Sequence, residues 1–126
     1  TVICDRFFDA TLAYQGYARG LDLSLLAQLH STVLNDLKPD LTLLLDLPPE
    51  IGLARAWKAI DKGKRTGDET RFEKETLSFH EKVRSGYLEL ASMEPGRFRI
   101  IDATGTEGEV LDRIKDSLLS YIEQNR

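Results

Sequence analysis

An acid and an arginine stand side by side near the start of the chain, directly after the apolar residues Val2 and Ile3. The guanidinium fork of Arg6 matches the oxygens of a phosphate, and the carboxylate of Asp5 suits a metal ion or a hydroxyl group. The pair therefore fits phosphoryl chemistry. The alternative is an ordinary ion pair at a strand end, and for an isolated Asp-Arg dipeptide that interpretation is favoured, because such surface pairs are common and weak.

A second group of cations lies around the segment DKGKRTGDET, residues 61–70, which has no apolar residue larger than threonine. Such a segment cannot offset the entropy of ordering by burial, so the sequence predicts a surface loop. Loops of this kind can neutralise a transferring phosphoryl group as they close. A merely solvated loop is an equal alternative. The cations are Lys62, Lys64, Arg65 and, just beyond the loop, Arg71.

Other chemistries find little support along the chain. The sequence contains neither G-x-x-x-x-G-K-[ST] nor G-x-S-x-G. The turn DATGTEGE resembles a phosphate loop, but its acids Asp102, Glu107 and Glu109 would repel a phosphate at the helix start. His30 and His80 have no partner at ligand spacing, and Cys4 is the only cysteine, so a directly ligated metal and a disulfide are both unsupported.

Three short apolar runs, residues 1–4, 41–47 and 98–102, alternate with helical patterns. This alternation predicts an α/β fold, with a parallel sheet of about three strands flanked by helices. In open sheets of this kind, ligands bind beyond the carboxyl ends of the strands. The stretches that follow the three runs, DRFFDAT, DLPPE and DATGTEGE, are therefore the candidate site segments.

Four helices are predicted around this sheet. Residues 22–37 carry apolar side chains at spacings of three and four, at Leu23, Leu26, His30, Val33 and Leu37. Another helix begins at Pro49 and Glu50, where proline and an acid are both favourable. A long helix runs from Arg71 to near Met93, with an apolar face at Phe72, Thr76, Phe79, Val83, Tyr87 and Leu90. The last helix is capped by Thr106 with Glu109, and is expected to bury Val110, Ile114, Leu118 and Ile122.

Length and composition fit one globular unit, with 126 residues of which 41% are hydrophobic. The net charge of -4 gives no general attraction to nucleic acid or to an anionic membrane. The chain lacks the roughly 20-residue apolar run that crosses a bilayer, and also a signal peptide. We therefore expect a cytoplasmic protein. Because the chain starts without methionine, inside an apolar run, we also expect it to be a fragment.

The stretch VICDRFFDATLAYQGYARGL closely resembles the nucleoside-monophosphate-binding segment of bacterial thymidylate kinases. The segments KPDLTLLLDLPPEIGLARA, ETRFE, FHEKVRSGYLELA and RIIDAT follow in that family's order, so the resemblance spans nearly the whole chain. It implies a P-loop kinase fold and transfer of the γ-phosphoryl group of ATP to dTMP, giving dTDP for dTTP synthesis. It further implies Mg²⁺ as the metal and a homodimer.

The resemblance also implies roles for the residues after the first apolar run. Arg6 corresponds to the arginine that holds the dTMP phosphate, and Asp5 to the neighbouring acid near the metal, contacting it through water. Thr11 and Gln15 fall where the family places polar side chains against the thymine edge. Tyr14 matches the aromatic residue under the deoxyribose, which disfavours a 2′-hydroxyl group.

On the donor side, the resemblance identifies residues 61–70 as the lid. Arg71, together with some of the cations at Lys62, Lys64 and Arg65, would reach the phosphates, so the implied catalytic set is Asp5, Arg6 and Arg71. Arg55 resembles an arginine near the adenine, and the backbone of residues 102–104 would border that base.

The chain departs from the family pattern in two ways. Phe7 stands where relatives more often have tyrosine or histidine. Family members also begin with a strand, a P-loop and a first helix ahead of the segment that matches Thr1, and that strand lies between those formed by residues 1–4 and 41–47. The chain is therefore interpreted as the carboxy-terminal part of a single kinase domain, spanning residues 1–126, inactive alone and prone to strand exchange. A kinase for another nucleoside monophosphate and a non-catalytic nucleotide-binding or dimerisation module are the alternatives.

Overall fold

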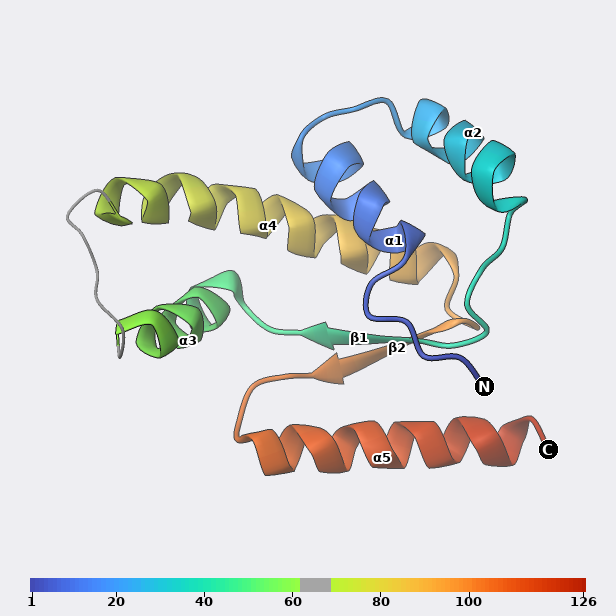
Figure 1. Ribbon diagram of the computed structural model, residues 1–126. Helices are drawn as coiled ribbons and strands as arrows, with labels where there is room; N and C mark the ends of the chain where they lie inside the picture. Colours follow the sequence, from blue (N-terminus) through green and yellow to red (C-terminus); the bar gives the residue numbers. More distant parts are fainter. Residues whose placement is uncertain (62–68) are drawn as a thin grey trace.

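The computed structural model describes residues 1–61 and 69–126, with side chains for residues 1–58 and 76–126. Helices and strands alternate along the chain (Figure 1). In chain order the elements are α1 (Phe8–Thr11), the π-helix η1 (Leu12–Ala18), α2 (Leu23–Leu34), β1 (Thr42–Asp46), α3 (Pro49–Asp61), α4 (Glu69–Met93), β2 (Phe98–Asp102) and α5 (Glu107–Gln124).

The sheet consists of β1 and β2, which are parallel and in register from Thr42 opposite Phe98 to Asp46 opposite Asp102. The connection between the two strands carries α3 and α4. Helix α4 lies over one face of the sheet and α5 over the other, so the sheet is the middle layer of three (Figure 1). This arrangement confirms the predicted α/β fold with a parallel sheet flanked by helices.

The predicted first strand is absent, and among the described residues the sheet has two strands rather than about three. Residues 1–4 are irregular, and Val2 and Ile3 are each 93% exposed. A strand is stable only when a neighbour accepts and donates its backbone hydrogen bonds. The run TVIC has the composition of a strand but no neighbouring strand with which to form a ladder.

The core lies where η1 crosses α4 above β2. Its buried members are small or medium-sized except for one ring, and they are Ala13, Val83, Leu90, Ala91 and Phe98. The crossing is close because Gly86 has no side chain: a Cβ there would lie 2.6 Å from the Cβ of Tyr17. The face of α4 predicted from its spacing is confirmed over its described part, because Val83 and Leu90 are buried and Phe79 and Tyr87 pack against them. Thr76 is half-buried, and the side chain of Phe72 lies outside the described ones.

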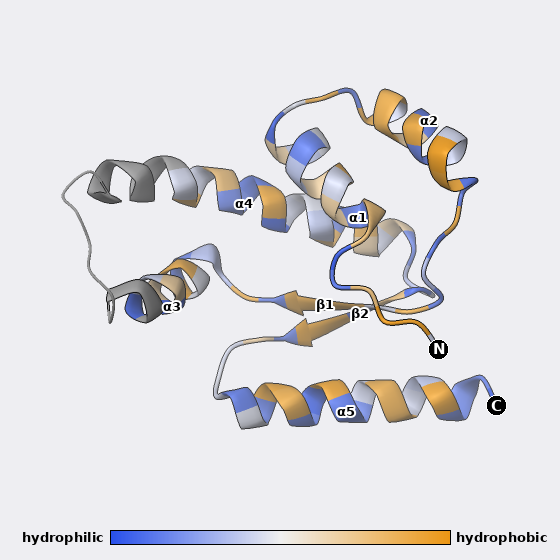
Figure 2. Ribbon diagram, viewed as in Figure 1, coloured by the Kyte–Doolittle hydropathy of each residue, from blue (hydrophilic) through white to orange (hydrophobic). Residues whose placement is uncertain are grey.

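The predicted apolar face of α2 is buried only in part. Leu26 and His30 are buried, but Leu23, Val33 and Leu37 are 39%, 72% and 62% exposed. Helix α2 contacts η1 and lies at the upper right of Figure 2, where most of its ribbon has the colour of hydrophobic residues.

Helix α5 starts as predicted, with the Thr106 hydroxyl accepting a hydrogen bond from the amide of Glu109 at 3.2 Å. The expectation that it buries four apolar residues is wrong, since none of its residues is fully buried and Leu118 and Ile122 are 39% and 46% exposed. It packs mainly against β2, so only part of its apolar face is covered. No helix in the described part of the chain is long and apolar enough to span a membrane.

Candidate functional site

The Asp-Arg pair lies in an irregular segment that leads into α1, and Arg6 adopts a left-handed backbone conformation with φ of +63°. This conformation costs a non-glycine residue about 1–2 kcal/mol. Strain of this kind persists only where the surrounding structure enforces it, and it is found most often at functional sites. The conformation turns the chain so that the guanidinium of Arg6 faces η1: Nη2 donates to the Tyr14 hydroxyl at 3.3 Å, and Cζ lies 5.0 Å from the centre of the ring.

Residues 8–18, for which the sequence predicted no helix, form α1 and then η1. π-helical segments are rare and concentrate at functional sites. This one carries Tyr14 and Gln15, and Thr11 immediately precedes it, so the three side chains stand at helical spacings of three and four. Gln15 accepts a hydrogen bond from Nη1 of Arg19 at 3.3 Å. Of the four residues that the resemblance assigns to dTMP, the structure brings Arg6 and Tyr14 into contact, and it places Thr11 and Gln15 on the same helical segment as Tyr14.

Helix α4 forms the wall behind Tyr14. The ring of Tyr14 lies 5.9 Å from Phe79 and 6.3 Å from Tyr87, the second pair being nearly perpendicular at 84°. Burial, with the neighbouring Tyr14, raises the pKa of the Tyr87 phenol to about 12. Sequence periodicity classified Phe79 and Tyr87 simply as core residues, because contact with a site residue has no sequence signal.

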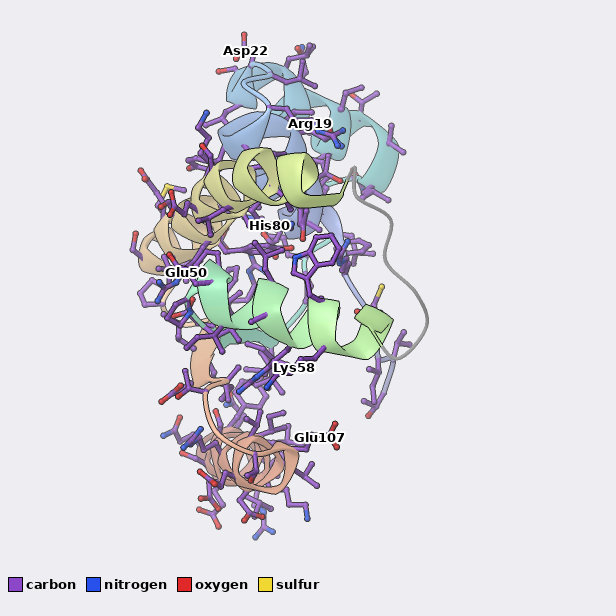
Figure 3. All side chains as sticks on the ribbon, turned by 90° about the vertical axis from the view of Figure 1, so that its left-hand side faces the viewer. Arg19, Asp22, Glu50, Lys58, His80 and Glu107 are labelled. Carbon is purple, nitrogen blue, oxygen red and sulfur yellow. The ribbon has the colours of Figure 1, made fainter. Side chains whose placement is uncertain are left out.

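A second arginine lies at the carboxyl end of β1. Nε and Nη2 of Arg84, on α4, donate to the two carboxylate oxygens of Asp46 at 2.9 and 3.1 Å. This two-point hydrogen bond raises the pKa of Arg84. Figure 3 views the molecule from the side at which both strands end, with α3, marked by Glu50 and Lys58, between α4 and the start of α5. The pair thus fixes α4 against the strand end that the sequence identified as a site edge.

The turn after β2 is held by two arginines. Arg55, on α3, donates to the carbonyl oxygens of Ala103 and Gly105 at 2.8 and 2.9 Å. Arg113 donates to the carbonyl oxygens of Asp102 and Thr104 at 2.8 and 2.6 Å. Four consecutive carbonyl groups from 102 to 105 are therefore engaged by guanidinium groups. The role near adenine stays a prediction for Arg55, but the structure shows that it orders the turn expected to border that base.

Hydrogen bonds from the hydroxyl and amide of Thr104 lower the pKa of Asp102, which caps the same turn.

The lid cations predicted at Lys62, Lys64 and Arg65 lie outside the described residues. Arg71 falls within α4, and its side chain lies outside the described ones.

Within the described residues, no group of three or more His, Cys, Asp or Glu side chains could hold a metal ion. Asp5 supplies one exposed carboxylate next to Arg6. Mg²⁺ is commonly held by one or two carboxylates together with substrate phosphates and water, so this single acid fits a magnesium ion that arrives with a nucleotide.

The parallel sheet and the helices on both faces define an α/β protein, in which the guanidinium of Arg6 faces the helix that follows it. A family model described as Thymidylate kinase matches residues 1–114. The chain belongs to the thymidylate kinase family, which confirms the resemblance read from its motifs.

Individual relatives agree with this assignment. A thymidylate kinase from Desulforapulum autotrophicum is 58% identical over 114 residues, which are 90% of this chain and 50% of the relative. One from Desulfosudis oleivorans is 51% identical over 126 residues, or 100% of this chain and 59% of the relative. A crystal structure of thymidylate kinase from Ehrlichia chaffeensis matches with a TM-score of 0.63 at 30% identity, covering 94% of this chain and 48% of that one. The chain corresponds to the carboxy-terminal part of its curated relatives and spans about half their length.

Proposed function

We propose that this chain supplies the acceptor-nucleotide half of a thymidylate kinase, which transfers the γ-phosphoryl group of ATP to dTMP and forms dTDP and ADP. The observation that carries the proposal is the left-handed Arg6 facing Tyr14 on a π-helix. A strained arginine against a helix that carries aromatic and amide side chains is suited to a ligand with a phosphate, a sugar and a base.

In this proposal Arg6 binds the phosphate of dTMP, because its planar fork can donate two parallel hydrogen bonds to phosphate oxygens. Tyr14 lies against the deoxyribose and leaves no room for a 2′-hydroxyl group, since its ring is fixed by Phe79 and Tyr87. Thr11 and Gln15 read the thymine edge, and a base that left them unpaired would be discriminated against strongly.

Phosphoryl transfer needs little covalent help from the protein, and its catalysis depends on positioning and on stabilising the charge of the transferred group. Arg6 would hold the acceptor phosphate in place, and Asp5 would hold a magnesium ion through water. Mg²⁺, when bound with ATP, supplies charge neutralisation between the phosphates. The cations on the donor side, Arg71 with Lys62, Lys64 and Arg65, add to this neutralisation.

The chain alone is proposed to be inactive. Its sequence has no G-x-x-x-x-G-K-[ST] motif to cradle the triphosphate, and among the residues that the structure describes β1 pairs with β2 on one edge only. Activity is therefore assigned to the protein expressed from its complete reading frame. A cytoplasmic location and a homodimer belong to the same proposal; the exposed apolar side chains of α2, among them Leu29 and Val33, support self-association.

The test is ATP-dependent dTDP formation by the protein expressed from its complete reading frame. Replacing Arg6 by methionine removes the fork and should lower kcat/KM for dTMP about 100-fold or more, the usual cost of losing one charge-stabilising donor. Lys115→Met, at an exposed position of α5, is the charge-matched control and should be near wild type. Unchanged turnover by Arg6→Met, or dTDP formation by residues 1–126 alone, would contradict the proposal.

A further inference from the structure

The short helix α1 lacks the interactions that normally define a helix start. It has four residues, and no side chain of its N-cap residue Phe7 bonds to its first turn. It continues directly into η1, and a helical segment that spans only residues 8–18 is marginal by itself. Its position, and that of the strained Arg6 just before it, must therefore be set by contacts with the rest of the fold.

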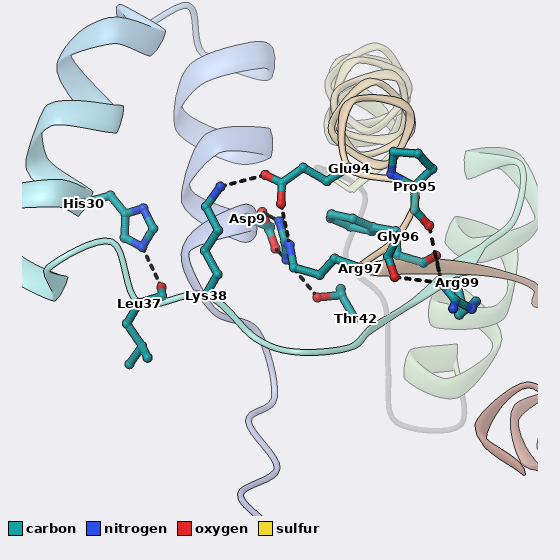
Figure 4. Close-up of polar contacts among 11 residues, drawn as sticks. Asp9, His30, Leu37, Lys38, Thr42, Glu94, Pro95, Gly96, Arg97 and Arg99 are labelled. Carbon is teal, nitrogen blue, oxygen red and sulfur yellow. Dashed lines mark hydrogen bonds and ion pairs between the residues drawn. The ribbon is translucent and has the colours of Figure 1, made fainter. Parts of the chain in front are cut away.

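An ion pair provides the strongest of these contacts. Nη1 and Nη2 of Arg97 donate to the two carboxylate oxygens of Asp9 at 2.7 and 3.0 Å, across 88 positions of sequence. The two side chains are 11% and 14% exposed, so water screens the pair weakly. The close-up in Figure 4 shows Asp9 held by Arg97 in the first turn of α1, three residues after Arg6.

Arg97 is itself held rigidly. Nε donates to Glu94 at 2.8 Å, Nη1 donates to the Thr42 hydroxyl at 3.0 Å, and Cζ lies 4.5 Å from the centre of the Phe98 ring. The backbone carbonyl of Arg97 also accepts from the amide of Thr42 at 2.8 Å, at the start of the strand ladder. The guanidinium of Arg97 is therefore held rigidly at the start of the sheet, and its ion pair with Asp9 attaches α1 to the sheet.

We propose that Arg97 is a positioning residue for the acceptor site: by clamping Asp9, it fixes the start of α1 and holds Arg6 in the left-handed conformation that faces the ligand. This inference rests on the proposed function and goes beyond it, because neither Asp9 nor Arg97 is assigned a role there. The bidentate fork matters as well as the charge, since lysine could not bond both oxygens of Asp9 while keeping Thr42 and Glu94.

The experiment compares steady-state kinetics of four single variants and one double variant in the protein expressed from its complete reading frame. Asp9→Asn keeps the shape and removes the charge, Arg97→Met removes the fork, and Arg97→Lys keeps the charge. Lys38→Met is the matched control, because it breaks the pair of Lys38 with Glu94 at 2.9 Å in the same cluster but leaves the clamp intact. Asp9→Asn and Arg97→Met should raise KM for dTMP about tenfold or more with kcat changed much less, as expected for a misplaced binding group.

In the same experiment, the KM of Arg97→Lys should lie between those of the wild type and Arg97→Met, and Lys38→Met should have the wild-type KM. The double variant Asp9→Asn with Arg97→Met should have a KM no higher than that of either single variant. Urea unfolding of each variant shows whether a raised KM comes from a displaced Arg6 or from a less stable protein. A folded Asp9→Asn protein with wild-type KM overturns the inference. So does a Lys38→Met protein whose KM rises as much as that of Arg97→Met.

A second measurement is independent of turnover. Carbon chemical shifts of isotopically labelled Arg6 report its backbone conformation, which is left-handed in the wild type. Loss of the left-handed conformation of Arg6 in Asp9→Asn would support the proposal that Arg97 positions Arg6, and persistence of that conformation would overturn it. If the wild-type protein forms no dTDP, the proposed function fails, while the Arg6 shifts still decide whether Arg97 positions that residue.

Discussion

The crossing of η1 over α4 provides the sharpest stability prediction, at Gly86. A Cβ at this position would lie 2.6, 2.8 and 3.0 Å from Cβ, Cγ and Cδ2 of Tyr17. The first of these atoms is fixed by the backbone of η1, so rotation of the tyrosine cannot relieve the contact. Replacing Gly86 by alanine must therefore push the π-helix away from α4, and with it Tyr14 and Gln15.

The expected magnitude follows from two opposing effects. Overpacking a buried contact costs about 1–3 kcal/mol, and a fixed backbone neighbour indicates the upper end of that range. Alanine gains about 1 kcal/mol over glycine inside a helix. The net expectation for Gly86→Ala is a loss of about 2 kcal/mol in the free energy of unfolding, measured by urea titration with far-ultraviolet circular dichroism.

Gly52 offers a matched control within the same chain. It is also a helical glycine, in α3, but a Cβ there would meet only Leu47 atoms at 3.8 Å or more. Gly52→Ala should therefore be neutral or up to about 1 kcal/mol more stable than wild type. The reasoning is refuted if the two variants have the same stability, because the Tyr17 contact would then be relieved without cost.

Three further predictions test the charge network, the α2 surface and the sugar site. A hydrogen bond from Arg97, helped by Lys38, holds the pKa of Glu94 at about 2, against an ordinary value of 4.5. The Glu94 carboxylate thus contributes stability that is present above pH 4.5 and lost as the pH falls toward 2. Because its side chain is 35% exposed, we expect this contribution to be less than about 1 kcal/mol. In urea unfolding across this pH range, the free energy of unfolding should fall less steeply for Glu94→Gln than for the wild type. Changing Leu29 and Val33 together to lysine should convert a dimer to a monomer in sedimentation experiments, whereas an unchanged mass would exclude this face as the interface. Tyr14→Ala should increase the use of the ribonucleotide analogue of dTMP relative to dTMP itself, and an unchanged ratio of kcat/KM values would exclude a sugar-reading role.

Sequence reasoning identified the elements whose signals are local. The periodicity of α4 and the cap of α5 at Thr106 were both confirmed, because helical spacing and a hydroxyl before an acidic turn depend only on neighbours in sequence. The strand at residues 1–4 was wrong because a strand needs a partner, and composition does not report whether one is present. The π-helix was missed because its wider hydrogen-bonding pattern has no simple apolar period.

The site shows the same division. Arg6 and Tyr14 were found because they lie within one motif, and the structure shows that they contact each other. Asp9 and Arg97 were missed although they form a well-buried ion pair, since a contact across 88 positions leaves no trace in local spacing. Arg55 was assigned to the adenine side from resemblance alone, and its bonds to the turn after β2 could not be derived from sequence.

The exposed apolar residues bear on which surfaces a dimer could complete. In the register of the sheet, Leu45 shares a face with Ile101 and points toward α5, whereas Ile100 shares a face with Leu44 and points toward α4. Leu45 and Ile100 are 49% and 54% exposed, so neither face of the sheet is fully covered.

A dimer through α2 would bury Val33 at one end of the molecule and leave both of these faces open. Self-association through α2 therefore cannot account for all of the exposed apolar surface. In the relatives, of which this chain spans about half, the additional residues are available to cover the sheet. It follows that mutations on α2 should change mass without repairing activity, whereas activity should depend on what covers the sheet faces at Leu45 and Ile100.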